Sequence, residues 1–140
     1  MIEVMTPSEI NEFVLAQKVG RIGCHRDGET YVVPVIYAWR DDCLYVYTTE
    51  GKKVEFMRRD ARVCFEIDDY LASGSWRSVI IQGTYEELRG EDAARALAIL
   101  TEQVRPKSSG RGDDDRGGGR LAVAFRIRAN DVTGRKVDRG

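Results

Sequence analysis

The sequence has a single histidine, His25, among its 140 residues. A Ser-His-Asp triad needs a histidine beside its nucleophile, and zinc sites draw on several closely spaced histidine or cysteine ligands. The three cysteines, Cys24, Cys43 and Cys64, show no C-x-x-C spacing. This scarcity argues against triad hydrolysis and zinc catalysis. We expect no metal site and interpret His25 as a turn residue.

The sequence also lacks an excess of charge of one sign and long apolar runs. Lysine and arginine together number 22 and aspartate and glutamate 23, so no global charge favours nucleic acid or an anionic membrane. No stretch approaches the roughly 20 apolar residues that span a bilayer. Residues 1–5 lack the features of a signal peptide, and the cysteines lie in apolar runs typical of buried, reduced thiols. We expect a cytoplasmic protein without nucleic-acid or membrane partners.

The composition is that of one globular domain. Hydrophobic residues make up 42% of the chain and charged residues 32%, which fits a single domain over residues 1–140. Residues 105–120 differ, because they are rich in glycine, aspartate and arginine and hold almost no apolar side chain. A flexible loop is expected there, with a flap over a ligand as the alternative. Residues 129–140 are expected to form a C-terminal tail.

Three segments carry helix signals. Thr6 and Glu9 form a capping box around Pro7, which suits the first helical position. Residues 51–59 predict a short helix, and residues 91–104 predict a longer one. The apolar stripe of the longer helix is expected to comprise Ala93, Leu97, Leu100 and Val104.

Strand-like runs dominate the rest of the chain. Six are expected, over residues 19–24, 30–39, 43–48, 62–67, 77–88 and 121–128. Pro34 lies within the second run and predicts an edge, a bulge or a break there, while Gly83 predicts a bend in the fifth. No helix separates the first three runs, which excludes a doubly wound parallel sheet. The expected fold is mainly β with α additions, an antiparallel barrel of six strands and about three helices.

The junction between the third strand and the short helix carries the most informative motif. Thr48 and Thr49 end the strand, and Gly51, Lys52 and Lys53 follow at the start of the helix. Hydroxyl groups, free amide groups at a helix N-terminus and ammonium groups together suit a phosphate. Lysines at a helix start also oppose the helix dipole unless an anion compensates. The alternative, two solvated lysines after a turn, stays open at this point.

Taken in order, several segments resemble a known family. They are residues 20–23, 31–37, 44–54 with its Gly-Lys-Lys, 61–66 and 76–83. Over about residues 6–127 the chain resembles the FMN-binding split-barrel superfamily of pyridoxamine 5′-phosphate oxidase-like proteins, and most closely its Nim-type, nitroimidazole-resistance-like branch. The resemblance implies an antiparallel split β-barrel that binds FMN and forms a homodimer with the flavin sites at the subunit interface.

The resemblance also implies roles within one subunit. The isoalloxazine ring would lie along the second strand, at Pro34, Val35, Ile36 and Tyr37. Thr48 and Thr49 would flank the ribityl chain or the phosphate. Gly51, Lys52 and Lys53 would hold the phosphate, with Lys53 in direct contact.

Further residues are implied around the ring. Trp76, Arg77 and Gln82 would approach the flavin across the dimer interface, and Tyr47 would shape the pocket together with Trp76. For Trp76, packing in the core or the interface is an equal alternative. No catalytic residue is assigned.

Two departures from the family narrow the function. The tail, residues 128–140, has no histidine, unlike the substrate-binding segment of genuine pyridoxamine phosphate oxidases, so that activity is not expected. Tyr47 stands where Nim-type proteins often carry a histidine, which argues against nitroimidazole reduction.

The expected function is an FMN-dependent oxidoreductase that passes electrons from a reduced nicotinamide or similar donor to a small-molecule acceptor. Three alternatives remain. They are a non-catalytic flavin-binding or storage module, a split barrel that uses a deazaflavin or haem, and a barrel with no cofactor.

Overall fold

The computed structural model describes residues 1–104 and 121–139. The expected loop over residues 105–120 lies outside the described residues. The helices are α1 (Pro7–Ala16), α2 (Lys52–Arg59) and α3 (Gly90–Val104). The strands are β1 (Glu3–Val4), β2 (Val19–Arg26), β3 (Glu29–Ile36), β4 (Ala38–Arg40), β5 (Cys43–Thr49), β6 (Arg62–Tyr70), β7 (Trp76–Leu88) and β8 (Ala122–Val137).

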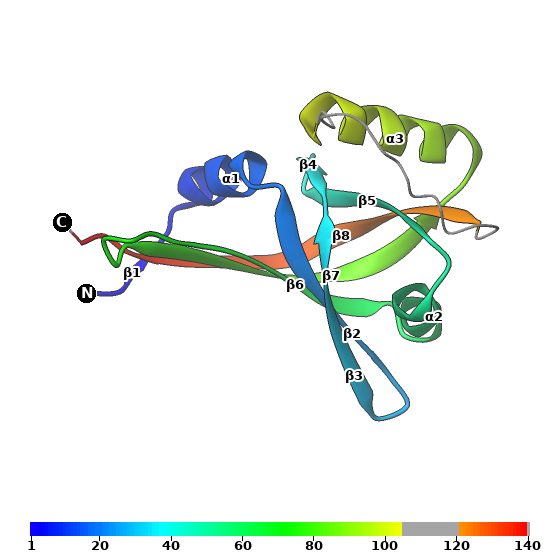
Figure 1. Cartoon of the computed structure of the whole chain (residues 1–140), viewed down its shortest axis with the longest axis horizontal. Helices are drawn as coiled ribbons and strands as arrows, with labels where there is room; N and C mark the ends of the chain where they lie inside the picture. Colours follow the sequence, from blue (N-terminus) through cyan, green and yellow to red (C-terminus); the bar gives the residue numbers. More distant parts are fainter. Residues whose placement is uncertain (105–120, 140) are drawn as a thin grey trace.

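The strands form one antiparallel sheet that does not close. Its order is β3-β2-β6-β7-β8-β5-β4, with β1 paired to the far end of β8. In Figure 1 the long strands β6, β7 and β8 run along the molecule, both termini lie at the same end, and the β2–β3 hairpin projects away from α1 and α3. The predicted mainly β split barrel with three helices is confirmed. β3 is an edge strand, as Pro34 predicted.

Over the described residues the structure has eight strands and not the expected six. One of the two additional strands arises because a predicted run divides into two strands that pair with different neighbours. The run over residues 30–39 divides at Tyr37, whose amide donates to the Lys18 carbonyl at 3.0 Å. Before this point β3 pairs with β2, and after it β4 pairs with β5. The apolar pattern continues through the break, because Val35 before it and Trp39 after it belong to the same core. The additional β1 is only two residues long.

The C-terminal residues 129–137 were expected to form a tail, and the structure instead includes them in β8. They pair with β7 from Trp76 to Gly83, and a register shift at Gln82 and Gly83 confirms the bend predicted there. A Cβ on Gly83 would lie 2.6 Å from the Arg128 carbonyl oxygen, so this close approach requires glycine. Asn130 and Asp131 favour turns locally, which concealed the strand from the sequence pattern.

The core lies inside the curved sheet, and α1 and α2 contribute to it. Fully buried members include Ile22, Phe65 and Phe125. The capping box is confirmed: the Thr6 hydroxyl accepts from the Glu9 amide at 3.1 Å, and the Glu9 carboxylate accepts from the Thr6 amide at 2.8 Å.

Helix α3 covers a second apolar cluster on β4, β5 and β8. It buries Ala96, Ile99 and Leu100, whereas Leu97 is 42% exposed. Leu100 is buried and Ala93 and Val104 pack against the cluster, as predicted, so of the predicted stripe only Leu97 lies away from it. In the described part of the chain, no helix has the length and apolar character needed to cross a membrane.

Candidate functional site

A hollow of about 320 Å³ opens between β3, β5 and the start of α2. Its lining residues are Val19, Pro34, Val35, Ile36, Val46, Tyr47, Thr48 and Lys53. Six of these eight belong to the cofactor site expected from the sequence. Strand β3 contributes its edge, and β5 contributes the point where it leaves the core. Segments far apart in the sequence thus converge on one concave surface.

The walls of the hollow are largely apolar. Ile36 is 55% exposed, and Val19, its partner across the β2–β3 pair, is also exposed. Tyr47 is exposed on the adjoining strand β5. Large apolar side chains that are exposed together mark a binding surface more often than a solvated one. A flat aromatic group fits such a surface.

Among the described residues that line the hollow, only Lys53 carries a charge. Burial lowers the pKa of its ammonium group, and the neighbouring Cys24 thiol partly offsets that effect. Among residues 1–104 and 121–139, no carboxylate forms an ion pair with Lys53. A half-buried ammonium without a counter-ion is costly, and a bound anion would compensate it. The hollow is therefore suited to a ligand with an apolar, flat part and an anionic part.

The adjacent Lys52 points to a different place. Its Nζ lies 3.2 Å from Glu29 Oε2 and 4.8 Å from the centre of the Tyr31 ring. This side chain is compensated by the β2–β3 hairpin and does not line the hollow. Gly51 is the N-cap of α2, and no side chain of the described residues caps the helix, so its first amide groups are suited to an anion.

The structure does not bring every predicted residue to the hollow. Tyr37 is buried, and its hydroxyl donates to the Val14 carbonyl at 2.6 Å, so its side chain belongs to the core. Burial also raises the pKa of Tyr37. Thr49 and Gly51 lie beside the lining residues in the chain without being part of the lining. Trp76 and Arg77 are at the distant end of β7, where Arg77 stacks 5.8 Å from the Phe13 ring centre.

Gln82 belongs to the outer face of the sheet. A second hollow of about 560 Å³ lies there, and its lining includes Gly23, Val32, Cys64 and Gln82. The Gln82 amide donates to the Cys64 sulfur at 3.6 Å. Cys64 is partly exposed, where the sequence predicted a buried thiol, whereas Cys24 and Cys43 are buried as expected. His25, which the sequence placed at a turn, is on the same face at the end of β2, with its side chain about half exposed.

Comparison with known proteins identifies the family. The sequence model described as pyridoxamine 5′-phosphate oxidase matches residues 6–136. The chain belongs to this family. The predicted split-barrel resemblance is thereby confirmed.

Two solved structures resemble this member of the pyridoxamine 5′-phosphate oxidase family over nearly its whole length. An FAD-binding protein from Mesorhizobium loti is 31% identical, with 99% of each chain covered and a TM-score of 0.79. A candidate 5-nitroimidazole antibiotic resistance protein from Bacteroides thetaiotaomicron is 21% identical, with 97% of this chain and 87% of that chain covered and a TM-score of 0.77. The second likeness shows the fold alone.

A curated relative comes from Rhizobium meliloti (strain 1021). This uncharacterised protein is 33% identical over 87 residues, which are 62% of this chain and 58% of the relative. The match therefore spans little more than half of the relative's length.

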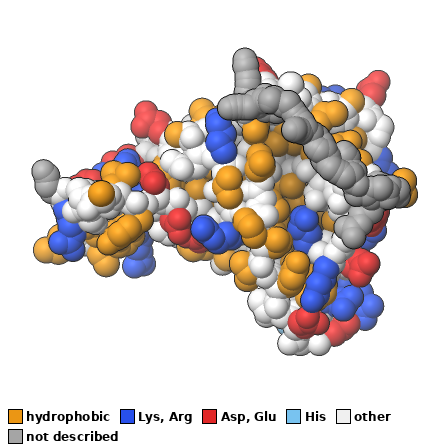
Figure 2. Space-filling model, in the orientation of Figure 1, with side chains coloured by type: hydrophobic (Ala, Val, Ile, Leu, Met, Phe, Trp, Pro, Cys, Tyr) orange, Lys and Arg blue, Asp and Glu red, His pale blue; other side chains and the backbone are white. Residues whose placement is uncertain are grey.

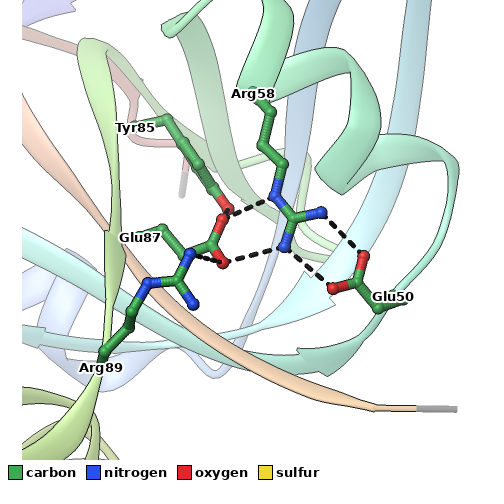
Figure 3. Close-up of polar contacts among 5 residues, drawn as sticks. All are labelled: Glu50, Arg58, Tyr85, Glu87 and Arg89. Carbon is green, nitrogen blue, oxygen red and sulfur yellow. Dashed lines mark hydrogen bonds and ion pairs between the residues drawn. The ribbon is translucent and has the colours of Figure 1, made fainter.

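Helix α2, whose residue Lys53 lines the hollow, also takes part in an ion-pair network that the sequence did not reveal (Figure 3). Arg58 of α2 binds Glu87 of β7, with Nε to Oε1 at 2.7 Å and Nη2 to Oε2 at 2.8 Å. Glu87 also accepts from the Tyr85 hydroxyl at 2.8 Å and from Arg89 at 3.0 Å. No sequence signal pairs Arg58 with Glu87, because they are 29 residues apart.

The network predicts a pH dependence of stability. Hydrogen bonds from Arg58, the largest cause, lower the pKa of Glu87 to about 2 from a usual value near 4.5. A depressed carboxylate pKa contributes stability that is present above the unfolded value and is lost as pH falls toward the folded value. We expect Glu87→Gln to show a smaller loss of unfolding free energy between about pH 5 and about pH 3 than the wild type.

Urea unfolding at a series of pH values measures this difference. The other carboxylates titrate in both proteins and cancel in the comparison. Equal slopes for wild type and Glu87→Gln would contradict the assignment.

Proposed function

We propose that this protein binds FMN in the hollow and works as a flavin-dependent oxidoreductase. The observation that carries the proposal is Lys53, a half-buried ammonium group without an acidic partner in the described structure, set among apolar walls. Family membership supports it, as does the FAD-binding protein that is 31% identical over 99% of its length. FMN is the form favoured here, because a terminal phosphate matches one ammonium group beside a helix start.

The lining residues divide between the two parts of the ligand. Lys53, the amide of the N-cap Gly51 and the first amide of α2, at Lys52, would hold the phosphate, with Thr48 and Thr49 beside it. The Lys52 ammonium is already paired with Glu29, so we assign this residue a main-chain contact only. Pro34, Val35, Ile36 and the main chain of Tyr37 would lie along the ring.

Bound flavin would supply the hydride and electron transfer that side chains do not perform. The chain itself supplies position and polarity. Apolar groups of β3 exclude water from one side of the site, and the exposed Tyr47 borders the space left for a small-molecule acceptor. The proposed donor is a reduced nicotinamide or a similar molecule. Oxidation of pyridoxamine 5′-phosphate is not proposed, because residues 128–140 hold no histidine.

We also propose that the protein is a homodimer with the flavin between its subunits. Ligand pockets generally enclose about 300–1,000 Å³, and the hollow, at about 320 Å³, is at the lower limit. One subunit would therefore leave part of a flavin uncovered. Hydrophobic side chains extend across one face of the molecule (Figure 2), and Val32 on the edge strand β3 is 61% exposed. An exposed apolar edge strand favours association.

In this dimer, Trp76, Arg77 and Gln82 would approach the flavin from the second subunit. They lie outside the hollow of their own chain, which is consistent with a role in the neighbouring site. The three free cysteines suit the reducing cytoplasm, which we propose as the compartment.

The direct test is the visible spectrum of the purified protein, followed by titration with FMN and riboflavin. We expect flavin bands and binding of FMN roughly 10- to 100-fold tighter than riboflavin, since a hydrogen bond to a charged group contributes about 1.5–3 kcal/mol. A colourless protein that does not bind FMN would overturn the proposal. A haem or deazaflavin spectrum would show that the cofactor is not FMN. Tight FMN binding without reduction by nicotinamide donors would indicate a storage module.

A further inference from the structure

A carboxylate lies next to the proposed phosphate site. Glu50 directly precedes Gly51, the N-cap of α2. An unpaired carboxylate at this position would repel a phosphate and would compete with it for the ammonium group of Lys53. A phosphate site at the start of α2 therefore requires that Glu50 be engaged elsewhere.

Arg58 engages it. Arg58 Nη1 donates to Glu50 Oε1 and Nη2 donates to Glu50 Oε2, each at 2.9 Å. This is a bidentate pair, the strongest arrangement of a guanidinium with a carboxylate. Figure 3 shows the guanidinium between Glu50 and Glu87, with one carboxylate on each side. Glu50 forms no ion pair with Lys52 or Lys53 in the described part of the chain, although both are closer in sequence.

The second carboxylate anchors the guanidinium to the sheet. The Glu87 side chain is 15% exposed and belongs to β7. Its contacts with Tyr85 and Arg89 hold it in place. The chain of contacts from β7 through Arg58 to Glu50 therefore connects the sheet to the bend at residues 50–51, directly before α2. Helix α2 has only eight residues and no side-chain N-cap, so this connection matters for the position of its first turn.

We infer that Arg58 is a positioning residue for the phosphate site. It neutralises Glu50 and holds that carboxylate away from Lys53, and it thereby sets the preference for a phosphorylated over an unphosphorylated flavin. This inference rests on the proposed FMN site. Arg58 does not line the hollow, so its effect on the ligand is indirect.

The test compares FMN with riboflavin, because a merely structural role would affect both alike. We expect Arg58→Met to weaken FMN binding about tenfold and riboflavin binding less than about twofold. Adding Glu50→Gln should restore most of the loss, since the double variant has no carboxylate left to compete. Arg58→Lys should fall between wild type and Arg58→Met, because an ammonium keeps the charge without the bidentate geometry.

Arg95→Met is the matched control. Arg95 pairs with Asp92 at 2.9 Å on the exposed surface of α3, and its replacement should leave both affinities unchanged. If Arg58→Met does not fold, Arg58→Lys with and without Glu50→Gln provides the same comparison.

Equal weakening of FMN and riboflavin, or failure of Glu50→Gln to restore FMN binding, would overturn the role of Arg58. A wild-type protein with no preference for FMN over riboflavin would instead refute the proposed site itself.

Discussion

Replacement of Lys53 by methionine is expected to weaken FMN binding roughly 10- to 100-fold and to leave riboflavin binding within about twofold. Lys53 lines the hollow and has no carboxylate partner in residues 1–104 and 121–139. Methionine retains much of the apolar length of the side chain and removes the charge. The loss should therefore fall on the phosphate alone. Fluorescence titration of both flavins measures it.

Lys52→Met is the matched control for this experiment. Lys52 is the next residue in the chain and carries the same charge, but it pairs with Glu29 at 3.2 Å. We expect its replacement to change FMN affinity less than about threefold, because exposed ion pairs contribute little free energy. A larger loss from Lys52→Met than from Lys53→Met would contradict the placement of the phosphate.

The contribution of Lys53 should also depend on pH. Burial lowers the pKa of Lys53 below that of an ordinary lysine. Its ammonium group is charged below this pKa and neutral above it, so the preference for FMN over riboflavin should decline as pH rises toward the alkaline range. In Lys53→Met this part of the pH dependence should be absent.

Phe65→Ala is expected to reduce the free energy of unfolding by about 3–5 kcal/mol, as for other buried phenylalanines. Phe65 is fully buried, and its ring meets Tyr37 edge to face, with centroids 5.5 Å apart. The cavity left by the ring would open behind the junction of β3 and β4. Chemical denaturation, with Tyr70→Ala as control, tests this. Tyr70 is 75% exposed, and its loss should cost less than about 0.5 kcal/mol.

The Phe65 ring also explains why residue 20 is a glycine. A double variant can show the coupling between the two positions. A Cβ on Gly20 would lie 2.2 Å from Phe65 Cε1, so Gly20→Ala should destabilise the wild type. In the Phe65→Ala background that contact is gone, and Gly20→Ala should be tolerated. Additive effects of the two substitutions would rule out this contact as the reason for the glycine.

Local sequence patterns were informative where structure depends on neighbours along the chain. Thr6 and Glu9 form the expected cap because both partners lie within one turn. Pro34 marks an edge strand because proline lacks the amide that a central strand needs. The alternating runs predicted most strands and, with the family resemblance, the split barrel. The predicted cofactor residues Pro34, Ile36 and Lys53 do share one hollow.

The tertiary structure determined which residues that are far apart in the sequence contact one another. The local motif does not distinguish Lys52 from Lys53, although the family resemblance favours Lys53 for the direct contact. The position of the β2–β3 hairpin pairs Lys52 with Glu29 and leaves Lys53 beside the hollow. In the same way, Arg58 pairs with Glu87, which is 29 residues away in the sequence. The sequence by itself thus determined the element types, the sheet edge and the residues available for a phosphate site. Packing determined which of the two lysines has a carboxylate partner among the described residues, because ion pairing depends on distances of a few ångströms that the fold alone establishes.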